Sequence, residues 1–157
     1  MDARVKLLWH GGVSGLHRGD TIRPDMVGHR CVEGCPVCEA HAKGEDHDLD
    51  PATPSGYVYA TTNRRYARFH ASKCVGGDLY RVRLVGPVEA SAEDGPFPTW
   101  RASSAAVVKI VERGVILTMK ERLDLFRRWG GTKAEFQTMM DDATARFSAY
   151  RETRAVA

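Results

Sequence analysis

Four side chains that can bind a metal ion lie within a short stretch of the chain, in the spacing C-x3-C-x2-C-x2-H. They are Cys31, Cys35, Cys38 and His41. Three thiolates and one imidazole form a tetrahedral ligand set that Zn2+ prefers in structural sites. The spacing therefore predicts a structural zinc ion, whose binding would order a loop that has little core of its own.

Alternatives to this zinc site remain open. His29 or His47 can replace His41 as the fourth ligand. The thiols can also be reduced surface groups, or form a disulfide in an oxidising compartment. A catalytic zinc ion is disfavoured, because it would keep an open coordination position and fewer soft ligands.

Charged residues of opposite sign are segregated along the chain. Residues 33–50 contain six acidic residues and one lysine, whereas residues 64–83 contain six basic residues and one aspartate. The net charge of +3 and the pI of about 8.7 are too small to require a nucleic-acid partner. One interpretation is that the acidic and the basic stretch each form a face of the protein that is exposed to solvent. The alternative is that the basic stretch flanks a site for an anion.

Length and composition set the frame in which these residues must be positioned. The chain has 157 residues, of which 43% are hydrophobic and 27% are charged, as in one ordinary globular domain. A domain of this size buries enough surface to fold without disulfide bonds. No signal peptide is evident, nor a run of about 20 apolar residues that would span a membrane. We therefore expect a cytoplasmic protein.

The hydrophobic pattern predicts strands with one helix among them. The predicted strands cover residues 5–10, 57–62 and 78–84, followed by one or two strands over 106–112 and 115–117. A helix is predicted from Asn63 to Ala71, with Thr62 as its N-cap. The segments 21–55 and 90–98 have no sustained period and are predicted loops.

The period changes to that of helices near the C-terminus. Leu123, Phe126 and Trp129 are spaced by three residues, and two glycines then end this helix. Thr132 with Glu135 is a capping box that opens a second helix. One face of that helix carries Phe136, Met139, Met140, Ala143, Phe147 and Tyr150, which we expect to be core. Strands followed by a helical tail predict an α+β fold.

Short motifs in the same order resemble the rifampin ADP-ribosyltransferase family, within the ADP-ribosyltransferase fold. The first is His-Gly at the end of the first strand, followed by Gly-Asp-x-Ile-x-Pro at residues 19–24. The others are Val-Tyr-x-Thr at 58–61 and Gly-Pro-Val-Glu at 86–89. The resemblance covers residues 7–117. It implies a transferase domain over 1–118 that contains a Cys/His-rich insertion at 28–50, with a helical extension over 119–157 packed on it.

The resemblance implies that the chain cleaves NAD+ and transfers ADP-ribose to a nucleophile. His10, Tyr59 and Asp94 would be its catalytic trio. His10 would hydrogen-bond a ribose hydroxyl, and Tyr59 would stack on the nicotinamide ring. The backbone at Gly11 and Gly12 would approach the nicotinamide amide. The residues expected to bind NAD+ also include Thr61 and Tyr66. The cationic group of Arg64, Arg65 and Arg68 would suit the pyrophosphate.

The carboxylate and the acceptor depart from the family pattern. The loop after residue 89 is shorter here, so the acid is assigned to Asp94, with Glu93 and then Glu89 as substitutes. The insertion and the helical tail would reshape the acceptor side. The resemblance implies a rifamycin-like hydroxyl compound as the acceptor, which would give antibiotic resistance, and these departures leave a macromolecule as the alternative.

Two functions without catalysis compete with this hypothesis. One is a zinc-dependent module that binds nucleic acid or protein, suggested by the Cys3His pattern and the basic stretch. It is disfavoured because the zinc segment is acidic and no exposed aromatic stacking platform is predicted. The other is a catalytically inactive relative of the transferases.

Overall fold

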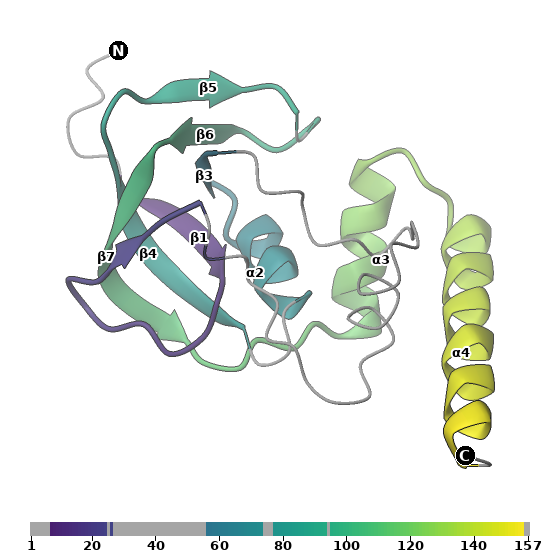
Figure 1. Cartoon of the computed structure of the whole chain (residues 1–157). Coiled ribbons are helices and arrows are strands. Elements are labelled where there is room, and N and C mark those ends of the chain that lie inside the picture. Colours follow the sequence, from purple (N-terminus) through teal and green to yellow (C-terminus); the bar gives the residue numbers. More distant parts are fainter. Residues whose placement is uncertain (1–6, 25, 27–55, 74–76, 94, 156–157) are drawn as a thin grey trace. The chain divides into compact units, whose positions relative to one another are not determined.

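The computed structural model of the chain describes residues 7–24, 26, 56–73, 77–93 and 95–155 (Figure 1). These residues belong to two compact units. The first contains the described residues up to 26 and those of 56–118, and the second contains residues 119–155. Each unit is described by itself.

The first unit is built on one antiparallel sheet of seven strands, in the order β2-β7-β4-β1-β3-β6-β5. The strands are β1 (Leu8–Gly12), β2 (Thr21–Ile22), β3 (Val58–Thr61), β4 (Asp78–Val85), β5 (Glu89–Ser91), β6 (Thr99–Ala102) and β7 (Ser104–Glu112). Together with the helices, this sheet confirms the predicted α+β class.

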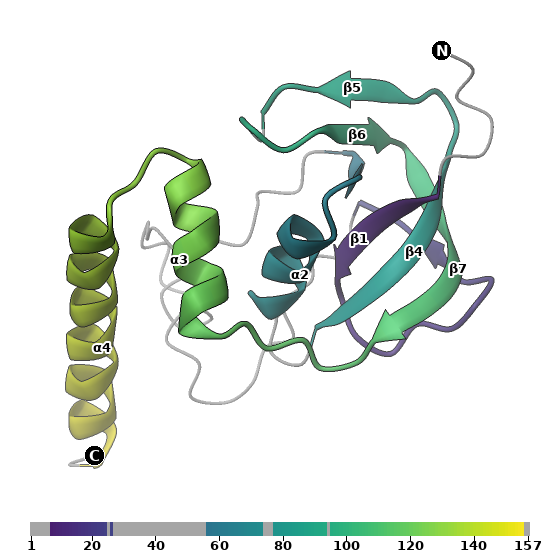
Figure 2. The ribbon, with the colours of Figure 1, turned by 180° about the vertical axis from the view of Figure 1, so that it is seen from behind.

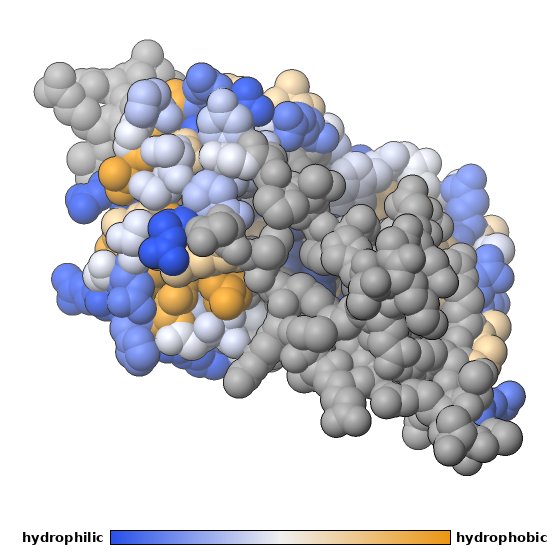
Figure 3. All heavy atoms as spheres, viewed as in Figure 1, coloured by the Kyte–Doolittle hydropathy of each residue, from blue (hydrophilic) through white to orange (hydrophobic). Residues whose placement is uncertain are grey.

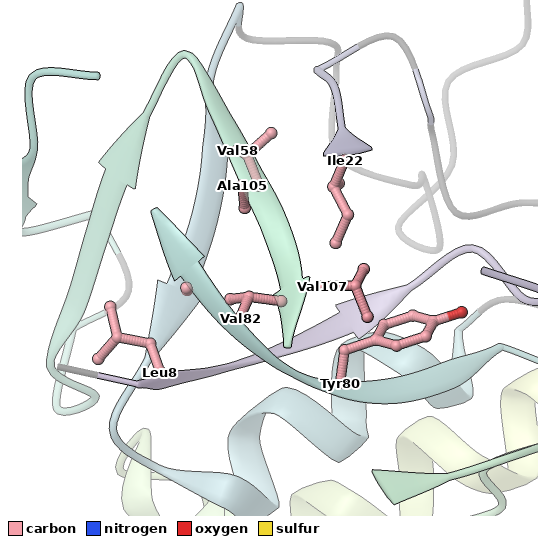
Figure 4. Packing of buried hydrophobic residues seen from close by; sticks show 8 residues of the cluster. Leu8, Ile22, Val58, Tyr80, Val82, Ala105 and Val107 are labelled. Carbon is pink, nitrogen blue, oxygen red and sulfur yellow. The ribbon is translucent and has the colours of Figure 1, made fainter. Parts of the chain in front are cut away.

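Alternate residues of the central strands form the main hydrophobic core, as Figure 4 shows. Its buried members are Leu8, Ile22, Val58, Ala60, Tyr80, Val82, Ala105 and Val107. On β4 these residues alternate with Arg81 and Arg83, as the period of two predicts. Each fully buried large apolar side chain contributes about 1.5–3 kcal/mol, so this core dominates the stability of the sheet.

The helix α2 (Arg64–Ser72) packs mainly against β1 and contributes to a second cluster (Figures 1 and 2). Its buried Ala67 and Ala71 pack with Leu79 and Val115, and Trp9 lies at the border of this cluster. At Gly11 a Cβ atom would lie 1.8 Å from the carbonyl oxygen of Ala67. The close approach of α2 to β1 therefore requires glycine at position 11.

Several predicted boundaries in the first unit are wrong. β1 continues through Gly12 instead of ending at His10, because it pairs with β4 along its whole length. Two of the predicted loop segments contain short strands, namely β2 and β5. Residues 115–117 are not a strand. The N-cap of α2 is Asn63, whose side chain accepts a hydrogen bond from the backbone N–H of Tyr66, and not Thr62.

The second unit contains α3 (Met119–Arg128) and α4 (Lys133–Ala155). The predicted capping box is confirmed, since Glu135 Oε2 accepts from the backbone N–H of Thr132 at 2.7 Å and Thr132 Oγ1 accepts from that of Glu135 at 3.2 Å. The rings of Phe126 and Phe136 lie 5.6 Å apart and join the two helices. Met139 is 46% exposed, so the prediction that it belongs to the core is wrong.

The surface of the first unit is mixed in character. On the face shown in Figure 3, hydrophobic side chains reach the surface between hydrophilic ones. Within the described part of the chain, no helix combines the length and the apolar character that a membrane span needs.

Candidate functional site

The two aromatic residues of the predicted catalytic trio lie in contact. β1 and β3 are neighbours in the sheet, with Trp9 opposite Thr61. The Nδ1 atom of His10 lies 2.8 Å from the carbonyl oxygen of Tyr59. Because a carbonyl oxygen only accepts, Nδ1 carries the proton and Nε2 of the neutral ring is an acceptor.

The surroundings of His10 favour this neutral form. Burial lowers the pKa of His10, and the hydrogen bond to Tyr59 opposes that shift only in part. A Cβ atom at Gly12 would lie 2.8 Å from Nε2 of His10. The glycine therefore leaves Nε2 the space that any larger residue would fill.

The side chain of Tyr59 lies beside a carboxylate. Its hydroxyl donates to Oε2 of Glu93 at 3.1 Å. Oε1 of the same carboxylate accepts from Nη1 of Arg101 at 3.3 Å, and Arg101 Nε donates to Glu89 at 3.2 Å. Tyr59 and Glu89 both stand opposite Arg101, on β3 and β5. The structure thus brings Glu93 to Tyr59 and connects Glu89 to Glu93 through Arg101, whereas Asp94 lies outside the described residues.

Sequence reasoning missed Arg101. It orients both glutamates, and its guanidinium also lies 4.4 Å from the ring centre of Tyr57. Its position beside Tyr59 depends on the pairing of β6 with β3, which are not consecutive in the chain. The alternation within β6 alone gives no sign of that pairing.

Tyr66 and Thr61 fix the segment that follows the acidic residues. Tyr66 is 4% exposed and stacks on Phe97, with ring centres 4.3 Å apart. Thr61 donates its hydroxyl proton to the carbonyl oxygen of Pro98 at 2.7 Å, and its Oγ1 accepts from the backbone of Asn63. Contacts of Tyr66 and Thr61 with a dinucleotide stay predictions. In the structure both residues position residues 97–98, a few residues after Glu93.

His70 is a second histidine at this site that sequence reasoning missed. Its ring meets that of Tyr66 edge-on, with centres 4.6 Å apart. Burial, together with the charges of Lys73 and His10, lowers the pKa of His70 to about 3. Both histidines therefore stay neutral at neutral pH.

A buried carboxylate anchors the loop that follows β1. Asp78 stands opposite Gly12 and is 1% exposed. It accepts hydrogen bonds from the backbone of Gly15 and Gly114, from the Tyr80 hydroxyl and from Arg113. Burial raises the pKa of Asp78, but these four donors together lower it below its usual value. The loop is thereby held at the end of the strand that carries His10.

The three arginines predicted near a pyrophosphate have different surroundings. Arg68 forms a two-pronged ion pair with Glu112, at 2.9 and 3.0 Å, so its guanidinium is already engaged. Arg64 lies with its guanidinium carbon 5.3 Å from the ring centre of Trp9. Arg65 is exposed on the first turn of α2.

The predicted zinc ligands Cys31, Cys35, Cys38 and His41 lie outside the described residues, as do the alternative ligands His29 and His47. Among the residues that the structure does describe, no cluster of three or more His, Cys, Asp and Glu side chains could hold a metal ion.

Comparison with known proteins adds no family assignment. No protein-family model matches the chain, and no curated protein matches it in sequence. Its function is therefore inferred from the residues of the site.

Proposed function

We propose that this chain is an NAD+-dependent mono-ADP-ribosyltransferase. One observation carries the proposal, namely the contact between His10 and Tyr59 on neighbouring strands, with the Tyr59 hydroxyl on the carboxylate of Glu93. His10 and Tyr59 are two members of the trio that the resemblance implies, and Glu93 is the first substitute for its acid, Asp94. The cysteine segment, in this proposal, binds a structural zinc ion.

The reaction exchanges one bond for another at C1′ of the nicotinamide ribose. The bond from C1′ to the nicotinamide nitrogen breaks, and its electron pair leaves with neutral nicotinamide. Positive charge develops on the ribose, and an acceptor hydroxyl or other nucleophile then bonds to C1′ and loses its proton. A carboxylate favours this path because it stabilises the developing cation or takes up that proton.

The described residues suit these steps. The neutral ring of His10 presents Nε2, which can accept a hydrogen bond from a ribose hydroxyl. The ring of Tyr59 offers a face for nicotinamide. Glu93 is the described carboxylate that contacts Tyr59, so it is our first assignment for the acid. Asp94 and Glu89 remain the alternatives from sequence.

The experiment is an NAD+ turnover assay on the full chain, with nicotinamide release measured in the presence of a rifamycin and of macromolecular acceptors. We expect His10→Ala and Tyr59→Ala to abolish release. The matched control is His17→Ala, which removes an exposed histidine from the loop after β1 and should leave release unchanged.

A second set of variants identifies the acid. Glu93→Gln, Asp94→Asn and Glu89→Gln remove one charge each, and we expect the first to lower the rate of release by a factor of about 100 or more. Intact NAD+ after prolonged incubation with every acceptor, together with no NAD+ binding by calorimetry, would refute the transferase and favour the alternatives without catalysis.

A further inference from the structure

Two guanidinium groups share one indole ring, that of Trp9 on β1, the middle strand of the sheet. The guanidinium carbon of Arg81 lies 4.1 Å from the ring centre of Trp9, and that of Arg64 lies 5.3 Å from it. Both distances are within the range of a cation–π interaction. Because both groups are held near the same ring, their positive charges are also held near each other.

The same face continues across the neighbouring strands with more positive charge. Arg81 stands directly opposite Trp9 on one side and opposite Lys109 on the other. Arg83 follows on the same face of β4 and is exposed, as Lys109 is. We call Trp9, Arg64, Arg81, Arg83 and Lys109 the cationic face. Like charges directly opposite each other destabilise a sheet, so this face carries a cost that an anion would relieve.

These cations differ from the other basic side chains of the unit. Arg68, Arg101 and Arg113 each form an ion pair with a carboxylate. Among the described residues, no carboxylate pairs with Arg64, Arg81, Arg83 or Lys109. Within the part of the chain that the structure describes, these four charges therefore have no acidic partner, and we take them as the charges that an anion would meet.

We propose that the cationic face binds the phosphodiester backbone of a nucleic acid. A nucleic-acid strand carries one negative charge per nucleotide, so a single strand can meet several of these cations at once. Three of the four cations are arginines, whose planar donors match phosphate oxygens. Guanidiniums that stack on an indole keep their N–H edges directed outward. Binding would be independent of sequence, because the Trp9 ring is engaged with arginine and not open to a base.

This site does not depend on the transferase reaction. Its test is the binding of a labelled 20-nucleotide single strand to the full chain by fluorescence anisotropy, over a series of salt concentrations. Four phosphate contacts predict that log K falls with log salt with a slope of about −3. Lys109→Ala and Arg83→Ala should each reduce the magnitude of that slope by about 0.7, because each removes one contact.

The controls distinguish binding at the cationic face from a general effect of positive charge and from misfolding. Arg127→Ala removes one exposed charge from α3 and should leave the slope unchanged. Among the described cations, Arg64 and Arg81 are those that lie over the Trp9 ring, so variants of Lys109 and Arg83 should keep the near-ultraviolet circular dichroism of the native chain. Absence of binding at 50 mM salt overturns the proposal, and so do variant slopes equal to that of the control. Equally tight binding of polyglutamate, or loss of NAD+ affinity in these variants without any oligonucleotide binding, also overturns it.

Discussion

The carboxylate of Asp78 and the guanidinium of Arg113 form an ion pair that joins the start of β4 to the residue after β7. Both partners also bind the loop after β1. Asp78 accepts from the backbone of Gly15 at 2.9 Å, and Arg113 donates to the carbonyl oxygen of Leu16 at 2.8 Å. The pair thus fixes the loop that continues from the strand of His10.

Asp78→Asn tests this anchor. The amide leaves Arg113 without its charged partner and faces donors that it cannot all satisfy, so we expect the free energy of unfolding to fall by roughly 3 kcal/mol. Arg113→Lys should cost less, because Asp78 keeps its other three donors. Urea unfolding measures both variants. The control is Asp20→Asn, which changes a more exposed carboxylate that accepts from the backbone of His17. Equal midpoints for Asp78→Asn and the control would contradict the anchor.

The elements with a clear local signal were predictable from sequence. β4 follows from its alternation, and the capping box of Thr132 and Glu135 marks the start of α4. β2 and β5 were not predictable, since two or three residues carry too little pattern and owe their strand geometry to β7 and β6. Met139 shows the reverse error, because its place on a periodic face did not bring it into a core.

The site was predictable in its residues more than in its contacts. His10 and Tyr59 came from motifs, but their contact arises from the pairing of β1 with β3, which are far apart in the chain and which no local pattern brings together. Arg101 and His70 were missed for the same reason. Arg101 reaches the site because β6 pairs with β3. His70 reaches it because its helix, α2, packs beside the strands and brings its ring against that of Tyr66.

Gly11→Ala and Gly12→Ala should separate the fold from the site. At position 11 the new Cβ would lie 1.8 Å from the backbone oxygen of Ala67, so α2 must move and the chain should lose at least about 3 kcal/mol of stability. At position 12 it would lie 2.8 Å from Nε2 of His10, a side-chain atom that can shift. We expect Gly12→Ala to keep most of the stability and to lose NAD+ turnover.

Thermal unfolding and nicotinamide release, measured on the same preparations, decide between these effects. Gly131→Ala is a control in the second unit, where a Cβ would meet the ring of Phe126. It should lower stability without a specific effect on NAD+ affinity. A Gly12→Ala variant with normal turnover would contradict the role given to Nε2 of His10.

The zinc ion predicted at Cys31, Cys35, Cys38 and His41 is tested by metal analysis of the full chain. Purification without a chelator should retain about one equivalent of zinc, and Cys35→Ser should retain less than roughly half. His41→Ala, His47→Ala and His29→Ala then identify the fourth ligand. Cys74→Ser, which changes the cysteine apart from the motif, is the matched control. A zinc content below half an equivalent in the unchanged chain would contradict the prediction.

The stability of the first unit should fall as the pH falls from about 6.5 towards 4. His70 binds a proton below about pH 6.5 when unfolded, but in the folded chain burial, Lys73 and His10 lower its pKa to about 3. Unfolding therefore takes up a proton in this range, and the free energy of unfolding falls by about 1.4 kcal/mol per pH unit for this residue. Burial of His10 acts in the same direction.

The variant His70→Phe tests this prediction. It keeps a ring against Tyr66 but removes the titration, so the unfolding free energy of the variant should depend less steeply on pH. Urea unfolding of both proteins between pH 4 and 7.5 measures the difference, in which the carboxylates common to both cancel. Parallel curves would show that His70 takes up no proton on unfolding.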